Sequence, residues 1–113
     1  MATYDAAFEK FTAEMIALGY HYHEGMYHAI TKHLGPSIHD KDASLVACSS
    51  AEERTYIKEH FLIGKLGLED GVELDEAIQR VCEAMGESNT NKHRATFYYL
   101  LTAILQKEDV FIE

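Results

Sequence analysis

The stretch "SNTNKHRATFYYLLTAILQ", Ser88–Gln106, leads from a cluster of polar residues into a long apolar run. Apolar side chains recur in it at helical spacing and cover nearly half of a helix's circumference: Phe97, Tyr98, Leu100, Leu101, Ile104 and Leu105. A helix with so wide an apolar face is buried on several sides. We therefore expect a helix over about Asn91–Gln106 at the centre of the fold, with Tyr98 at the edge of its buried face and Tyr99 outside.

Glycines divide the rest of the sequence into segments with helical periodicity. Glycine readily adopts the left-handed conformation that ends many helices. Such a stop follows an apolar-periodic segment at four places: Gly19, Gly35, the Gly64/Gly67 pair and Gly86. Four stops predict five helices, and no long window alternates apolar and polar residues as a strand does. The predicted fold class is all-α, a compact bundle of about five helices in a single domain over residues 1–113.

The bounds of the other four helices follow from the same pattern. We expect helices over about Asp5–Leu18 and His21–Leu34. A third begins at Ser50, where Ser50 and Glu53 form a capping box, and a fourth follows Asp70 and continues to Met85. The central last helix is predicted to pack against the first, third and fourth.

The charge of the chain excludes two classes of partner. The formal net charge is −9, with 19 acidic residues against 10 Lys and Arg, and the isoelectric point is near 5.1. Such a surface repels nucleic acid and acidic membranes, so we expect neither as a partner. The first residues lack the basic and apolar regions of a signal peptide, and no apolar run approaches the ~20 residues of a membrane span. The predicted location is cytoplasmic.

The two cysteines predict neither a disulfide framework nor a zinc cluster. Cys48 and Cys82 are few and far apart in the sequence. Cys82 falls in the apolar stripe of the fourth helix, where a thiol is usually a small, inert core residue. Cys48 precedes the capping serine and is expected to be more exposed. We expect no cofactor.

Histidines are concentrated in the segment "YHYHEGMYHAITKH", Tyr20–His33, which invites a metal-binding hypothesis. If this segment is one helix, His21, Glu24 and His28 share a stripe and form the only candidate metal site in it. His23 and His33 fall on the other side, so the four histidines do not converge. The pattern favours a polar outer face with these two histidines buried along the apolar side.

The start of the last helix carries cations where helices usually carry acids. Unpaired N–H groups give a helix N-terminus partial positive charge, yet Lys92, His93 and Arg94 stand there. One interpretation pairs these cations with acids near Glu83 and Glu87. The other makes Asn91, Lys92, His93 and Arg94 a binding site for a small anion, a phosphate or a carboxylate.

Several segments resemble a family of small uncharacterised bacterial proteins, a domain of unknown function. The resemblance rests on "LGPSIHDKDASLVACSS", "FLIGKLGL", "SNTNKHRATFYYLL" and "KEDVF", in that order, over about Leu34–Phe111. The chain departs from it at His39 and His93, where the resembling segments have tyrosine. The resemblance implies a small, all-helical cytosolic protein and supplies no activity, cofactor or catalytic residue.

Three functions remain open at this point. The first is a non-enzymatic binding or protein-interaction module, with a protein partner or a second copy bound through an acidic surface that bears tyrosines. It rests on the lack of any convergent catalytic constellation. The alternative is a small-anion binding protein that uses Asn91–Arg94. The third is a metal binder through His21, Glu24 and His28.

Overall fold

The computed structural model describes residues 3–89 and 91–112. Its α-helices are α1 (Tyr4–Ala17), α2 (Glu24–Leu34), α3 (Ala51–Tyr56), α4 (Val72–Ala84) and α5 (Arg94–Ile104). Shorter helical segments are η1 (Gly35–His39), the π-helix η2 (Ile57–Ile63) and η3 (Glu108–Val110). These residues form no β-strand; one isolated bridge joins Leu45 and His93. The predicted all-α bundle of five helices is confirmed.

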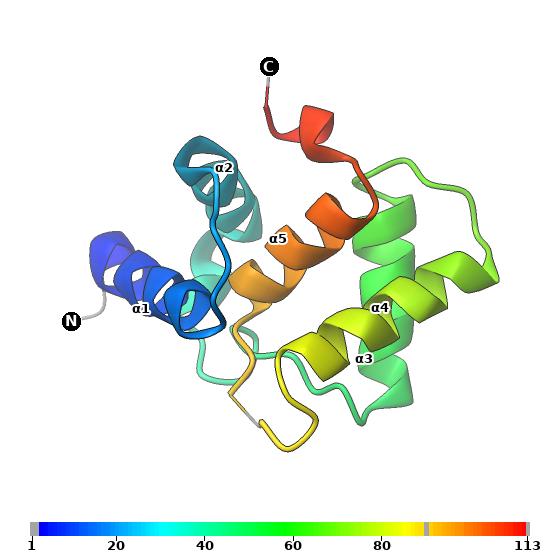
Figure 1. Cartoon of the computed structure of the whole chain (residues 1–113), viewed down its shortest axis with the longest axis horizontal. Coiled ribbons are helices and arrows are strands. Elements are labelled where there is room, and N and C mark those ends of the chain that lie inside the picture. The colour runs from blue at the N-terminus through cyan, green and yellow to red at the C-terminus, as the bar shows by residue number, and fades with distance from the viewer. Residues whose placement is uncertain (1–2, 90, 113) are drawn as a thin grey trace.

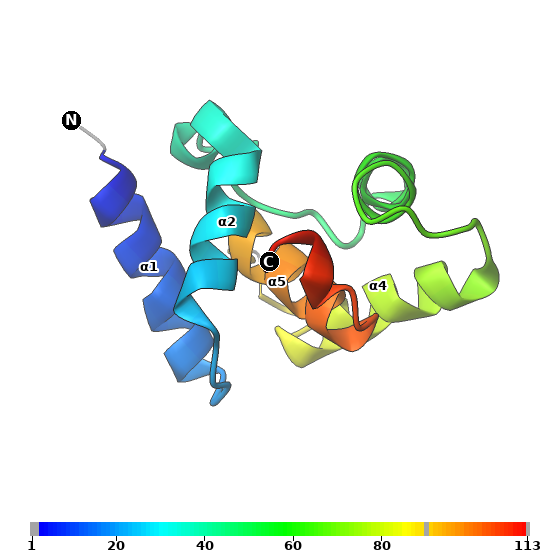
Figure 2. The same ribbon diagram turned by 90° about the horizontal axis from the view of Figure 1, so that it is seen from above.

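Helix α5 lies in the middle of the molecule, with α1 and α2 on one side and α3 and α4 on the other (Figure 1). The view turned by 90° gives the same order (Figure 2). Helix α5 packs chiefly against α2, α4 and α1. The predicted neighbours of the central helix were the first, third and fourth helices, and the structure has α2 in place of the third. The reason is that α3 is short and contributes no buried residue, so its side of the core is supplied by the following segment, η2.

The buried face of α5 is wider than its periodicity suggested. Every residue from Ala95 to Thr102 is buried. Tyr99, which was expected outside, is only 7% exposed, because the chain entering α2 covers it and the backbone N–H of His23 donates to its hydroxyl at 2.7 Å. Thr102 is buried without cost because its hydroxyl donates to the carbonyl of Tyr98 at 2.8 Å. The helix is therefore enclosed on nearly all sides.

Two helices begin later than the periodicity indicated. Helix α2 starts at Glu24 instead of His21, because the ring of His23 caps it: Nδ1 accepts from the backbone N–H of Met26 at 3.0 Å. Helix α5 starts at Arg94 instead of Asn91. The expectation that His23 and His33 are buried is wrong, since both are exposed.

The third predicted helix continues into a π-helix. In η2 the backbone N–H of Gly64 donates to the carbonyl of Glu59, five residues earlier, at 3.0 Å. This wider turn rotates the following side chains relative to an α-helix. Phe61 and Leu62 point into the core, and the ring of Phe61 stacks on Tyr98 of α5 with centroids 4.0 Å apart. The π-helix therefore replaces α3 as the contact with α5.

Cys48 and Cys82 form a disulfide between the segment before α3 and helix α4, with Cα atoms 6.0 Å apart. Cys82 lies in the core, as expected, but the expectation that it is a free thiol is wrong. The sequence separation of 34 hid the pairing, which depends on α4 returning beside the start of α3. None of the described helices has both the length and the apolar character needed to cross a bilayer.

Candidate functional site

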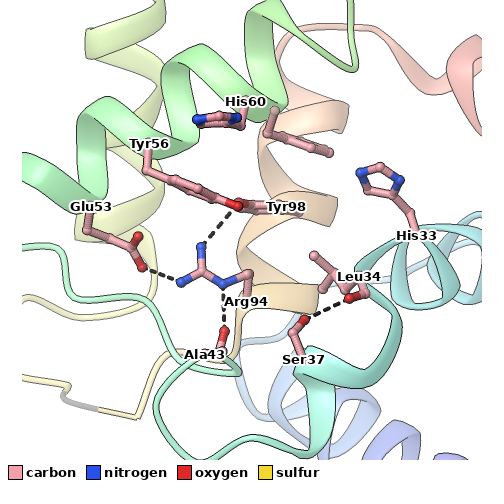
Figure 3. A pocket seen from close by; sticks show the side chains of 10 residues that line it. His33, Leu34, Ser37, Ala43, Glu53, Tyr56, His60, Arg94 and Tyr98 are labelled. Carbon is pink, nitrogen blue, oxygen red and sulfur yellow. Dashed lines mark hydrogen bonds and ion pairs between the residues drawn. The ribbon is translucent and has the colours of Figure 1, made fainter.

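A cavity of about 370 Å³ gathers side chains from both halves of the molecule, and we call it the Arg94 cavity. Its lining comes from α2, η1, the following loop, α3, η2 and α5: His33, Leu34, Ser37, Ala43, Glu53, Tyr56, His60, Phe61, Arg94 and Tyr98. Figure 3 shows the guanidinium of Arg94 between Glu53 and Tyr98. Convergent polar groups from separate elements in one hollow are typical of a binding site.

Arg94 is held in place by contacts from three directions. Its Nε donates to the carbonyl of Ala43 at 2.7 Å, and one terminal nitrogen donates to the carbonyl of Leu45 at 3.1 Å and to the carboxylate of Glu53. The other terminal nitrogen, Nη1, donates to the hydroxyl of Tyr98 at 3.1 Å. Burial acts to lower the pKa of Arg94, but Tyr98 and Glu53 raise it above its ordinary value. The guanidinium is a fixed positive charge.

Arg94 and Tyr98 each keep one hydrogen-bond donor that can serve a ligand. A guanidinium has five N–H groups, and the contacts of Arg94 with described residues occupy four of them, which leaves one N–H of Nη1. Burial raises the pKa of Tyr98, so its hydroxyl keeps its proton at neutral pH. That hydroxyl accepts from Arg94 and keeps its own hydrogen to donate. A pair of neighbouring donors therefore serves the cavity.

Aromatic rings form the upper walls of the cavity. The ring of Phe61 stacks on that of Tyr98, and the ring of Tyr56 stacks on His60 with centroids 4.4 Å apart. His33, from α2, stands across from them (Figure 3). Partial loss of solvent around the ring, with the nearby charge of Lys65, lowers the pKa of His33. At neutral pH this imidazole is uncharged and offers one donor and one acceptor.

The four residues predicted as one anion site point in different directions. Arg94 faces the Arg94 cavity. Asn91 and His93 line a second cavity, between α1 and the loop after η1. Lys92 is 2% exposed and its ammonium donates to the carbonyl of Asn89 at 2.5 Å. The structure thus divides the four residues among two cavities and a buried contact. Arg94 pairs with Glu53, and Nδ1 of His93 lies 3.3 Å from Oε2 of Glu14, so neither of these two residues pairs with Glu83 or Glu87.

Of the predicted metal residues, Glu24 and His28 lie together, with Nε2 of His28 3.7 Å from Oε1 of Glu24, but His21 does not join them. His21 precedes α2, because that helix begins only at Glu24. His28 Nδ1 hydrogen bonds with the hydroxyl of Tyr4 at 2.7 Å, and its ring stacks on Phe8 at 3.8 Å. Over residues 3–89 and 91–112, no three His, Cys, Asp or Glu side chains are close enough to share a metal ion.

A third hollow, of about 340 Å³, is mainly apolar and lies where the α1–α2 connection meets α4 and α5. Tyr20 and Ile104, which are 43% and 39% exposed, stand in its wall. The sequence-based prediction of self-association or a protein partner stays a prediction.

Sequence reasoning missed most of the Arg94 cavity. Glu53 was assigned to a capping box, and Tyr56, His60 and Ser37 were not connected with Arg94. One signal was present, since Arg94 and Tyr98 are four residues apart and share a face of the helix. Glu53 lies 41 residues from Arg94 in the sequence, and no local pattern joins them.

Taken together, the fold and the cavity define a small all-α domain with a preformed polar site between its helices. The sequence pattern of a family described as a protein of unknown function (DUF2853) matches residues 11–109, and the chain belongs to this family. The expectation of an uncharacterised family is thereby confirmed, and the match begins within α1. No curated protein matches the chain.

Proposed function

We propose that the protein is a non-enzymatic binding protein that holds a small, uncharged, polar molecule in the Arg94 cavity. The observation that carries the proposal is the pair of spare donors on Arg94 and Tyr98, which serve a cavity of about 370 Å³. Their rigid fixation supports it as well, because a preorganised donor loses little entropy when a ligand binds.

The ligand is proposed to be uncharged because the charges of Glu53 and Arg94 already compensate each other beside the cavity. The carboxylate of Glu53 is paired with Arg94, and their side chains are only 16% and 11% exposed. An anionic ligand would meet this carboxylate, and a cation would meet the guanidinium. A neutral carbonyl group accepts from both spare donors without either penalty. The stacked rings of Phe61 and Tyr98 suit a planar group beside that carbonyl.

The proposal is for binding without catalysis because the usual nucleophiles are otherwise engaged. Ser37 donates its hydroxyl to the carbonyl of Leu34 at 2.8 Å, and Cys48 and Cys82 are joined to each other. Within the described part of the chain, no serine or cysteine side chain is hydrogen bonded to a histidine, the arrangement that activates such nucleophiles.

The cytoplasmic location remains part of the proposal and meets one opposing observation. Disulfides persist chiefly in oxidising compartments, and Cys48 and Cys82 form one. Alkylation of free thiols in intact cells, followed by mass spectrometry, decides the point. Alkylated Cys48 and Cys82 support a reducing cytoplasm, whereas protection of both until a reductant is added contradicts it.

A titration with uncharged planar amides tests the ligand class. Nicotinamide, uracil and benzamide are added to ¹⁵N-labelled protein, and amide shifts are followed by NMR. We expect at least one probe to shift resonances of Arg94, Tyr98 and His60 together, and to raise the thermal midpoint. If no probe moves these resonances, or if benzoate moves them more than benzamide does, the proposal is wrong.

Adjacent tyrosines provide a matched pair of variants. Tyr98→Phe removes the donating hydroxyl from the cavity, whereas Tyr99→Phe removes a hydroxyl that contacts His23 outside it. The loss of one hydrogen bond weakens binding by about two- to tenfold. We expect this weakening in Tyr98→Phe only. Equal affinities of the two variants would contradict the assigned role of Tyr98.

A further inference from the structure

The second cavity, of about 520 Å³, lies between α1 and the loop that joins η1 to α3. Its deepest lining is apolar, since Ala7, Phe11 and Ile38 are 8%, 2% and 8% exposed. Leu45 adds a half-buried wall beside them. The volume lies within the range of about 300–1,000 Å³ that is usual for small-molecule sites. The cavity therefore offers an apolar floor to a compact hydrocarbon or aromatic group.

Basic side chains surround this floor, which is unusual for so acidic a chain. Lys10 of α1, His39 of η1 and Lys41 of the loop are exposed at the rim. Among the residues that the structure describes, no aspartate or glutamate lines the cavity, although the chain has 19 of them against 10 Lys and Arg. Neither Lys10 nor Lys41 forms an ion pair with a carboxylate of the described residues. Neither ammonium group is therefore held by a direct ion pair with a described carboxylate, although Asp40 and Asp42 flank Lys41 in the sequence.

His93 completes the polar side of the cavity. Its Nδ1 lies 3.3 Å from Oε2 of Glu14, whose side chain is 13% exposed and does not line the cavity. The other ring nitrogen, Nε2, makes no hydrogen bond with the residues that the structure describes. Asn91 and Ser44 line the same side and add an amide and a hydroxyl. Three hydrogen-bonding side chains thus accompany the two lysines.

The geometry points to this cavity as a binding site for an amphipathic organic anion, with an apolar body and one carboxylate or phosphate head. The body lies on Phe11 and Ile38, and the head lies between Lys10 and Lys41. Positive charge beside low-dielectric walls concentrates anions locally even when the rest of the surface repels them. The site is independent of the Arg94 cavity, where Glu53 compensates the cation.

Four probes separate the contributions of charge and apolar area. Octanoate and octyl phosphate carry both, octanol carries only the chain, and acetate carries only the charge. Binding is measured at low salt by ¹³C-methyl NMR of Ala7 and Ile38. We expect octanoate or octyl phosphate to shift these methyls, with the tighter of the two identifying the head group, and octanol and acetate to bind at least about tenfold more weakly.

Lysine variants test the site without risk to the fold, because the side chains involved are exposed. The double variant Lys10→Gln/Lys41→Gln removes both rim charges, and Lys32→Gln on α2 removes an exposed charge elsewhere. We expect the double variant to weaken binding of the anion about tenfold, and Lys32→Gln to leave it unchanged.

Four outcomes would overturn the inference: neither octyl anion binds, octanol binds as well as octanoate, acetate binds as well as octanoate, or the double variant keeps full affinity. Each of them leaves the nicotinamide titration of the Arg94 cavity unaffected, so the two proposals fail separately.

Discussion

At the scale of single residues, Arg94 connects three parts of the chain. Its guanidinium contacts the carbonyls of Ala43 and Leu45, the carboxylate of Glu53 and the hydroxyl of Tyr98. These partners fit a planar fork of donors and do not fit a point charge. The same side chain therefore fixes the loop before α3 and prepares the cavity.

Arg94→Lys tests how far this fork stabilises the fold. A lysine ammonium can reach only some of the four acceptors that Arg94 contacts, so the remaining buried acceptors lose their donor. We expect the free energy of unfolding to fall by about 2–4 kcal/mol, measured by urea denaturation. Arg80→Lys on the exposed face of α4 is the matched control and should change little. Equal stability of the two variants would show that the fork geometry is unimportant.

His33 predicts a pH dependence whose sign follows from its environment. Burial and Lys65 lower the pKa of His33 below its usual 6.5, so the unfolded state takes up the proton first. The folded protein therefore keeps its full stability with respect to His33 above pH 6.5, and the free energy of unfolding decreases as the pH falls through the lowered pKa of this residue. We expect His33→Gln to show a smaller loss of stability between pH 7 and pH 5 than the wild type, measured by urea midpoints.

Lys65→Gln provides a second check on this histidine. Removal of the cation brings the pKa of His33 closer to its usual value, so this variant should also lose less stability on acidification. The assignment to His33 is contradicted if His33→Gln retains the full pH dependence of the wild type.

At the scale of elements, the π-helix η2 determines which residues reach the cavity. It brings His60 to the cavity and Phe61 onto Tyr98, while α3 before it holds Glu53. Wider π-turns recur at functional positions in helices. Gly64 ends the segment, and a Cβ at that position would lie 2.7 Å from the carbonyl oxygen of His60.

Gly64→Ala tests whether this turn is under steric control. In an ordinary helical setting, glycine to alanine stabilises by about 0.4–1 kcal/mol. Here the added methyl meets backbone, which moves only if the π-turn shifts, so we expect a loss of about 1–3 kcal/mol. Urea denaturation gives the sign, and NMR shifts of His60 and Phe61 report the displacement. A stabilised variant with unmoved resonances would contradict the steric account.

At the scale of the whole molecule, two long-range connections hold the structure together, one within each of the halves on either side of α5. The disulfide between Cys48 and Cys82 ties the loop before α3 to α4. On the other side, the buried hydroxyl of Tyr27 on α2 donates to the carbonyl of Phe11 on α1 at 2.9 Å and contacts Thr96 of α5. Burial raises the pKa of Tyr27, so this hydroxyl stays protonated.

The disulfide is expected to stabilise mainly by restricting the unfolded chain. For a closed loop with a sequence separation of 34, the entropy model gives about 3–4 kcal/mol. The variant Cys48→Ser/Cys82→Ser should lose that amount in urea denaturation, and a reductant should destabilise the wild type but leave the variant unchanged. If the wild type and the variant unfold at the same urea concentration, the bond contributes nothing.

Prediction from sequence succeeded where the determining interactions are local. The periodicity of residues 91–106 located a central helix, and the helix cap at Ser50 is present, with its hydroxyl accepting from the backbone N–H of Glu53 at 3.2 Å. The reciprocal half of the predicted capping box is not formed, because the Glu53 carboxylate pairs with Arg94 and the backbone N–H of Ser50 donates to the carbonyl of Ala47. Prediction failed at Tyr99 and at the cysteine pair. A helical wheel shows which side of one helix is apolar but not whether another segment covers the opposite side, as the start of α2 covers Tyr99.

By itself, the sequence determined that the chain forms five helices, that the last of them is buried, and which glycines end the others, because spacing and caps act within a few residues. Only the tertiary structure decided that Arg94 contacts Glu53, that Cys48 bonds to Cys82, and that Lys10 and Lys41 line one cavity with no carboxylate from the described residues. These contacts depend on how the helices are placed around α5. Burial against several partners at once sets that placement, and no short window of sequence contains it.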